Sequence, residues 1–341
     1  MQKNLISAGA LAAALLLALP SSAQAASAPG WRVTAKAKGI ELFDVVAFSR
    51  TQAWAWGTNG DTTQVVRRVN GHWKSVPLSP YLRTGSTRAL AGSSSANLWI
   101  AGTKQDPELG SVGYVARWNG STWGSPAVLP SGLAVSALVV RGPKDVWYFT
   151  YQGIAGHFNG TKWSTVQVGF PVTRAQAAGG QIWAAGARMS TTGGTVRPSL
   201  ARWTGRKWQA AKLPSGTGYL ESVAIVGPKN VWAAGSTAAG RSLLLHWNGK
   251  AWKKYKAPGT GFFAISSDGA KGLWLSGSST RLLRLTGGKW KKPAIKGVPG
   301  SSLPLVLPAF ARIPGTTSVW AVGGHLSTKG FKDALVLKFG R

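Results

Sequence analysis

The sequence predicts an all-β protein, a seven-bladed β-propeller with four antiparallel strands in each blade. Two repeated patterns predict this fold: a tryptophan run that recurs at the length of one blade, and a glycine turn followed by tryptophan. In addition, the last repeat breaks off early, while the amino-terminal segment supplies a matching strand. Arranging the sheets around an axis buries both faces of each sheet and leaves only short edges.

The tryptophan run marks the second strand of each blade. It reads AWAWG, LWIAG, VWYFT, IWAAG, VWAAG, LWLSG and VWAVG, with tryptophan at positions 54, 99, 147, 183, 232, 274 and 320. A short apolar stretch precedes each run, as SVAIV does at 222–226, and turn residues such as GPKN separate the two. This order predicts that strands one and two of each blade form a hairpin.

The glycine turn marks the outer hairpin of each blade. It reads RRVNGHW, ARWNGSTW, GHFNGTKW, ARWTGRKW, LHWNGKAW or RLTGGKW, and its Asn-Gly or equivalent pair permits a positive φ angle in a tight turn. In the fifth unit, Trp247 is expected to end strand three and Trp252 to open strand four. We expect this tryptophan pair to pack between neighbouring sheets.

The two chain ends are predicted to share one blade. The seventh unit ends ALVLKFGR at Arg341, where the other units continue with tryptophan and a fourth strand. Residues 30–39, GWRVTAKAKG, resemble the WKKYKAPG strand of the fifth unit, so they are expected to complete the last blade, with Trp31–Lys36 as its outermost strand. Residues 26–341 then form a single domain.

The amino terminus has the pattern of a secretory signal. Lys3 precedes an apolar run from Leu5 to Leu19, and Ala23 and Ala25 fit an A-x-A cleavage site, which predicts a signal peptide over residues 1–25. The run is short for a membrane-spanning helix, and no later segment comes closer. We expect a secreted, extracellular monomer, with cell-wall attachment as a further expectation. The chain has no cysteine, so no disulfide stabilises it.

Charge is the other unusual property. The chain has 40 Lys and Arg against 9 Asp and Glu, a net charge of +31, and residues 241–341 hold 17 basic and 2 acidic side chains. Such an excess favours anionic partners, although solubility or a high-salt habitat also explains it.

The repeats resemble kelch-type repeats of the galactose-oxidase-like propeller superfamily. The matching residues are the glycine pair of VWAVGG at 319–324 and the aromatic residue followed by tryptophan, as in Trp118 and Trp123. Arrays of this kind are similar to those of secreted actinobacterial proteins of unassigned role. The oxidase's copper site needs cysteine, tyrosine and histidine ligands, so the lack of cysteine excludes that chemistry, and SSDGAKGLW has the wrong spacing for a sialidase-type Asp-box.

Other catalytic and metal sites find little support. Asp145 and Asp268 fit turn positions, and among the acids only Glu41, Asp44 and Glu221 are expected to meet on the loop face. The four histidines belong to four different units, so we expect neither a metal nor a cofactor. A basic residue recurs before each turn: Arg68, Arg117, His157, Arg202, His246, Arg284 and Lys338. We interpret it as stacking on a neighbouring blade's tryptophan or bonding a turn carbonyl, and the alternative is an anion-binding ring on the face that carries the Asn-Gly turns.

Two surfaces are candidate binding sites. A loop-face pocket for a sugar acid or another anion would use Tyr81, Arg83, Arg88, Arg174, Tyr219, Arg241, Phe262 and Phe263. A set of cations on and beside the outermost strands of the last three blades, which we name the basic wall, would bind a polyanion: Arg32, Lys36, Lys250, Lys253, Lys254, Lys256, Lys289, Lys291 and Lys292.

The sequence therefore favours an exported, non-enzymatic binding propeller. Its expected partners are anionic polymers of the cell envelope or matrix, such as teichoic acid, acidic polysaccharide or extracellular DNA. Two alternatives remain open at this point, a lyase acting on anionic glycans through loop-face Tyr or Arg, and a protein-interaction scaffold.

Overall fold

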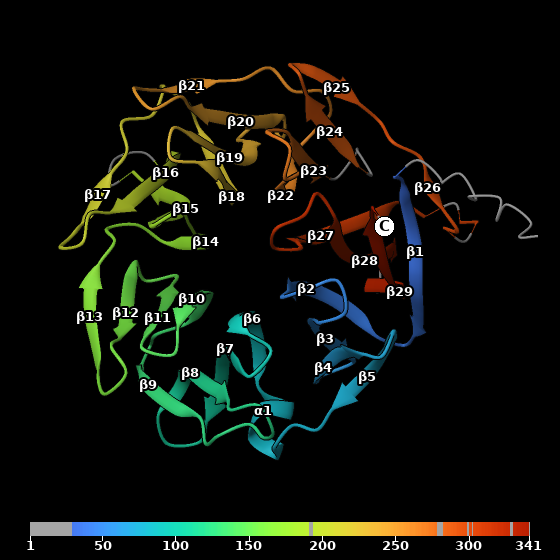
Figure 1. The fold of residues 1–341 in the computed structure, drawn as a ribbon. Coiled ribbons are helices and arrows are strands. Elements are labelled where there is room, and N and C mark those ends of the chain that lie inside the picture. Colours follow the sequence, from blue (N-terminus) through green and yellow to red (C-terminus); the bar gives the residue numbers. More distant parts are fainter. Residues whose placement is uncertain are drawn as a thin grey trace, which may run out of the picture.

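The structure is a computed structural model that describes residues 29–190, 194–277, 282–298, 300–301, 303–327 and 330–340. These residues form seven antiparallel sheets arranged around a central axis (Figure 1). The predicted seven-bladed propeller is therefore confirmed. The proposed signal peptide, residues 1–25, lies outside the described residues and stays a prediction.

Each of the first six blades contributes four strands in chain order from the axis outward. Blades one to three are β2 (Glu41–Ala47), β3 (Ala53–Asn59), β4 (Thr62–Val69), β5 (His72–Val76); β6 (Ser86–Ser94), β7 (Asn97–Asp106), β8 (Gly110–Trp118), β9 (Ala127–Ser131); β10 (Val135–Gly142), β11 (Asp145–Thr150), β12 (Ile154–Phe158), β13 (Trp163–Gln167). Blades four to six are β14 (Val172–Ala178), β15 (Gln181–Met189), β16 (Val196–Trp203), β17 (Trp208–Ala210); β18 (Gly218–Gly227), β19 (Asn230–Thr237), β20 (Ser242–Trp247), β21 (Trp252–Lys254); β22 (Phe262–Ser267), β23 (Leu273–Gly277), β24 (Leu283–Thr286), β25 (Lys289–Lys291). A short helix, α1 (Pro80–Thr84), connects blades one and two.

The seventh blade contains both ends of the chain. Its strands run in the order β26 (Ile295–Lys296), β1 (Trp31–Lys38), β29 (Gly330–Phe339), β28 (Val319–Ser327) and β27 (Leu305–Arg312). Antiparallel pairing of β1 with β29 confirms the predicted closure. The prediction is wrong in one detail, because the two-residue strand β26 pairs in parallel with the start of β1 and covers its outer edge there.

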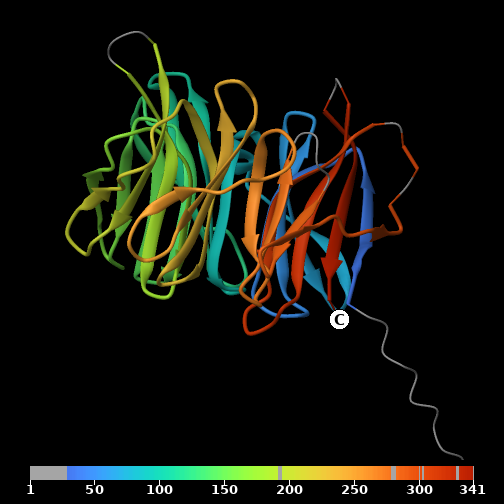
Figure 2. The same ribbon diagram turned by 90° about the horizontal axis from the view of Figure 1, so that it is seen from above.

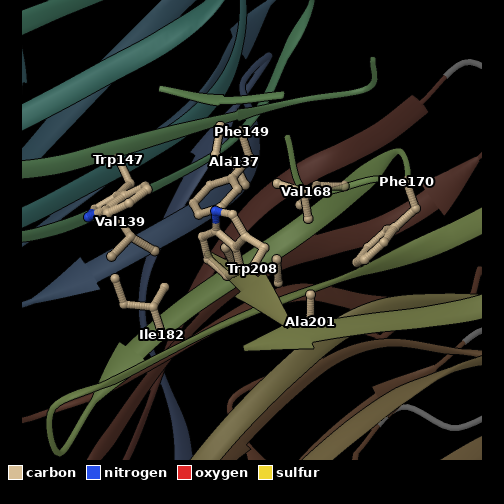
Figure 3. Packing of buried hydrophobic residues seen from close by; sticks show 13 residues of the cluster. Ala137, Val139, Trp147, Phe149, Val168, Phe170, Ile182, Ala201 and Trp208 are labelled. Atoms are coloured by element: carbon tan, nitrogen blue, oxygen red, sulfur yellow. The ribbon is translucent and has the colours of Figure 1, made fainter. Parts of the chain in front are cut away.

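The core is divided into seven apolar clusters, one at each junction between neighbouring blades. Figure 3 shows the junction of blades three and four, where Trp147 and Trp208 pack edge to face with ring centres 5.7 Å apart. At the junction of blades four and five, the ring of Trp252 lies 5.4 Å from that of Trp183, and Trp247 lies beside them. The expected packing of the Trp247–Trp252 pair between sheets is confirmed.

Most of the tryptophan runs end in glycine for a steric reason. A Cβ atom on Gly57, Gly102 or Gly235 would overlap the backbone carbonyl of strand one in the same blade. The register of strand one also shifts beside each of these glycines. Only a residue without a side chain allows the two strands to approach this closely.

The two open faces of the ring differ in the connections they carry. One face, here called the turn face, carries the turns between strands one and two and between strands three and four. The carboxyl-terminal end of β29 lies on this face (Figure 2). The opposite face, here called the pocket face, carries the connections from each blade to the next. Every first strand therefore runs along the central channel from the pocket face to the turn face.

Candidate functional site

A cavity of about 810 Å³ opens at the pocket-face end of the central channel. Among the described residues, its lining comes from six of the seven blades, so no single repeat contains the site. One wall, from blades one and seven, is apolar and includes Phe43, Trp56, Val306 and Leu326. The remaining wall is polar and holds Asp61, Arg88, Tyr151, Arg174 and Glu221. The cavity combines an apolar surface with convergent charged groups, as ligand sites commonly do.

An ion pair crosses the channel at the base of this cavity. Arg174 of β14 donates from Nη1 to Oδ2 of Asp44 of β2 at 3.0 Å, which joins blades four and one. Oδ1 of Asp44 also accepts the backbone N–H of Val45. Arg174 lines both this cavity and the channel of about 400 Å³ beyond it, so the pair separates the two spaces. Burial raises the pKa of Asp44, and the nearby Arg174 and the Val45 N–H only partly offset that effect.

Glu221 of β18 also lies near Arg174, and both line the cavity. Burial raises the pKa of its carboxyl group, while the charge of Arg174 lowers it. Within the described residues, the Glu221 side chain makes no hydrogen bond and no ion pair. The expectation that Asp44 and Glu221 meet on one face thus corresponds to two carboxyl groups beside one guanidinium, whereas Glu41 does not line the cavity.

The raised pKa of Glu221 has a consequence for stability. A carboxyl group that binds its proton more tightly in the native state destabilises that state when ionised, and this penalty disappears as the pH falls to the unfolded value of about 4.3. We expect Glu221→Gln to melt at a higher temperature than the parent at pH 7, with the difference shrinking on acidification. Thermal unfolding of both proteins across this pH range measures it. A difference that does not change with pH would contradict the assignment.

Of the predicted pocket residues whose side chains the structure describes, two line this cavity, Arg88 and Arg174. Arg83, Tyr219 and Arg241 are exposed but lie outside its lining. Tyr81 packs edge to face on Tyr114, and the Lys104 ammonium lies 4.3 Å from the centre of its ring.

The two phenylalanines of that set have different outcomes. Phe262 is fully buried in the cluster between blades five and six, so its ring does not reach the loop surface. Phe263 belongs to β22, but its side chain falls outside the described residues.

The aromatic part of the cavity was not predicted. Trp56 lies two residues after the repeated Trp54, and its ring centre is 5.4 Å from that of Phe43. Tyr151 follows β11 and is 44% exposed. The one available signal was the second tryptophan of AWAWG, which no other repeat has. The break in the repeat marks the blade that supplies the aromatic wall.

All nine residues of the basic wall are exposed, and they lie on or next to β21, β25 and β1. These strands follow one another along the outer edge of the ring (Figure 1). Lys38 and Lys296 are exposed on β1 and β26 and extend the wall. In the part of the chain that the structure describes, none of the nine takes part in an ion pair.

A second group of cations adjoins the wall where blades seven and one meet. The pKa of Lys338 is lowered by its burial and by the positive charges of Arg32, Arg68 and Arg50. Lys338 also lies 5.4 Å above the ring of Trp320. The turn-face end of this junction therefore concentrates positive charge.

The recurring basic residue lies opposite a tryptophan in most blades, but the predicted tryptophan, that of a neighbouring blade, is wrong there. In blades two to seven it pairs across the sheet with the tryptophan of its own blade, and the closest stacks join His157 to Trp147 and His246 to Trp232. Burial lowers the pKa of His246, which favours the neutral form of that ring.

Blade one departs from this arrangement. Its turn consists of two residues, Asn70 and Gly71, and Arg67 is the residue opposite Trp54. Arg68 lies on the other face of the sheet and reaches Trp320 of blade seven at 5.2 Å. Only here does the predicted contact with a neighbouring blade occur.

Asp145 and Asp268, in the turns between strands one and two, have the predicted structural role. Oδ1 of Asp268 accepts the N–H groups of Ala270 and Gly272, and Oδ2 accepts two hydrogen bonds from Arg284. Asp145 accepts from the indole of Trp147 and contacts His157. Among the described residues, no group of three His, Cys, Asp or Glu side chains is arranged to hold a metal ion.

Comparison with known proteins identifies the fold but no family. No protein-family model and no curated protein matches the chain. Among solved structures, U3-55K has a TM-score of 0.65 and 12% identity over 92% of this chain and 100% of its own. The structure of YCF48 bound to D1 peptide has a TM-score of 0.63 and 14% identity, over 91% of this chain and 97% of its own. A catalytically inactive virginiamycin B lyase from Staphylococcus aureus with quinupristin has a TM-score of 0.65 and 10% identity, over 90% of this chain and 99% of its own.

These similarities show the propeller fold alone. The closer relationship to kelch-type repeats stays a prediction. A search of the described residues for a helix that is long and apolar enough to cross a membrane finds none.

Proposed function

We propose that this protein is a non-enzymatic binding propeller that attaches to anionic polymers through the basic wall. These polymers are those of the cell envelope or matrix, such as teichoic acid, acidic polysaccharide or extracellular DNA. The proposal includes export directed by residues 1–25 and a location outside the cell or at its wall.

One observation carries this proposal: nine exposed cations occupy consecutive outer strands without an ion-pair partner among the described residues. Charged side chains on an edge strand also prevent edge-to-edge pairing, and Glu would serve that purpose as well as Lys. The choice of one sign is what a polyanion partner explains. Binding of this kind is driven by counterion release, so it weakens steeply with salt and discriminates little between polymers.

Reversing four charges tests the proposal. We expect a variant with Lys253, Lys254, Lys291 and Lys292 changed to Glu to bind teichoic acid and DNA more weakly, with a flatter plot of log affinity against log salt concentration. For a nucleic acid, the slope falls by about 0.7 to 0.9 for each phosphate that the variant no longer neutralises. The melting temperature should stay nearly unchanged, because all four side chains are exposed. Binding titrations at several salt concentrations measure this effect.

The matched control reverses four exposed lysines of blades three and four, Lys144, Lys162, Lys207 and Lys212, which changes the net charge equally. Equal weakening in the two variants would show that total charge, not the wall, drives binding. If the parent binds no polyanion at low salt, the wall is a solubility device. Binding to a single protein that persists in high salt would instead support an interaction scaffold.

A further inference from the structure

The pocket-face cavity holds polar groups with unused bonding capacity. The Glu221 carboxyl lines it without a hydrogen bond or ion pair among the described residues. Arg174 uses one nitrogen for Asp44, and the remaining donors of its guanidinium have no described partner. Arg88 is exposed in the same lining and makes no ion pair within the described residues. The charged groups that a ligand meets here are thus two carboxylates, Glu221 and the exposed Asp61, and two guanidinium groups, Arg88 and Arg174.

The chemistry of these groups selects hydroxyl groups as the ligand's contacts. Glu221 requires a donor, whereas the neighbouring Arg174 requires an acceptor. A hydroxyl group does both, so a pair of adjacent hydroxyls satisfies the two side chains together. A free cation would also suit Glu221, but it would have to approach a protein with a net charge of +31.

The rest of the lining suits a ring. Phe43 and Trp56 form an aromatic pair on one wall, continued by Val306 and Leu326 of blade seven. This wall can cover the C–H face of a sugar while the polar groups opposite hold its hydroxyls. The volume of about 810 Å³ falls in the range of small-molecule sites. The uncompensated Arg88 adds a position for an anionic substituent.

We infer that this cavity binds one saccharide unit carrying a carboxylate, a uronic acid, with ring hydroxyls on Glu221 and Arg174 and the carboxylate directed to Arg88. This site is distinct from the basic wall, which lies on the outer edge of the ring. The inference does not depend on the wall. It supplies selectivity for one sugar, which counterion release does not provide.

Binding of two simple glycosides tests the inference. We expect methyl glucuronoside to bind the full mature chain more tightly than methyl glucoside in calorimetry or ligand-observed NMR at physiological salt. Glu221→Gln should weaken both about tenfold, since it removes a charged acceptor. Arg88→Ala should weaken only the glucuronoside, to the level of the glucoside. Two exposed residues outside the lining provide matched controls, Glu108→Gln and Arg83→Ala, which should bind like the parent.

Several results would overturn this assignment. These are failure of the parent to bind either glycoside, equal affinity for both, or unchanged binding by a folded Glu221→Gln variant. Binding of a free amino acid in place of the sugars, lost in Glu221→Gln, would show that the carboxylate receives an ammonium group. The four-site wall variant should bind the glucuronoside like the parent, so failure of the wall proposal is distinguishable from failure of this one.

Discussion

Deletion of residues 26–38 is expected to destabilise the propeller more than the loss of any one side chain. It removes β1, which pairs with β29 from Trp31–Phe339 to Lys38–Asp333. It also removes Trp31, which is 1% exposed and whose ring centre lies 5.1 Å from that of Trp274. Loss of the buried tryptophan alone costs about 3 to 5 kcal/mol, and β29 is left as an unpaired edge. Aggregation or a much lower melting temperature should result.

Two further variants make this result interpretable. Trp31→Ala keeps the strand but loses the packing with Trp274 and Phe339, so it should recover part of the stability. A deletion of residues 26–29 leaves β1 whole and should melt like the mature protein. Circular dichroism and light scattering during heating measure both effects. If the longer deletion also melts like the mature protein, β1 is not what holds the seventh blade closed.

Replacement of Asp268 by Ala is expected to have the second largest effect. The Asp268 side chain is 0% exposed, yet it carries a carboxylate that accepts from two backbone N–H groups and from Arg284. Removing it leaves these backbone donors without their acceptor and leaves the guanidinium of Arg284 without its carboxylate partner. Breaking a buried ion pair on one side costs about 3 to 5 kcal/mol. Denaturant unfolding at neutral pH gives the change in free energy.

Asp106→Ala is the matched control for this change. Asp106 accepts the N–H groups of Glu108 and Leu109 in a similar turn, but it is more accessible and has no arginine partner. Its loss should cost no more than about 1.5 kcal/mol. Asp268→Asn keeps a turn acceptor and should fall between the two. Equal effects at Asp106 and Asp268 would mean that turn bonds alone explain the cost.

The repeat predicted the fold because each unit repeats the same steric needs. The glycine after Trp232 lies against the carbonyl of Tyr219, and the tryptophans fill equivalent blade junctions, so the period is visible in the residues themselves. Ring closure was also predictable, since a missing strand at one end matched an extra strand at the other. The small strand β26 was missed because its two residues carry no strand pattern, and the short helix α1 was also not predicted.

The cavity was less predictable because its residues come from six blades. Arg88 and Arg174 were identified as charges near first strands, but nothing in the sequence places Arg174 beside Asp44 on the far side of the ring. The prediction that Phe262 lies on the loop surface was wrong because this first residue of β22 is buried in the cluster between blades five and six. Sites built by non-repeated residues across a ring require the three-dimensional structure.

The pairing of the first strand with the last also determines when folding can finish. The side chain of Arg32 bonds the carbonyl of Gly340, 308 residues later in the chain. Synthesis delivers β1 before the other strands of the ring and β29 after them, so the seventh blade forms only after nearly the whole propeller has been made. The entropy of closing such a loop grows slowly with length, by about 0.6 kcal/mol for each doubling, but contacts this distant in sequence slow folding. Until β29 is made, β1 has no antiparallel partner.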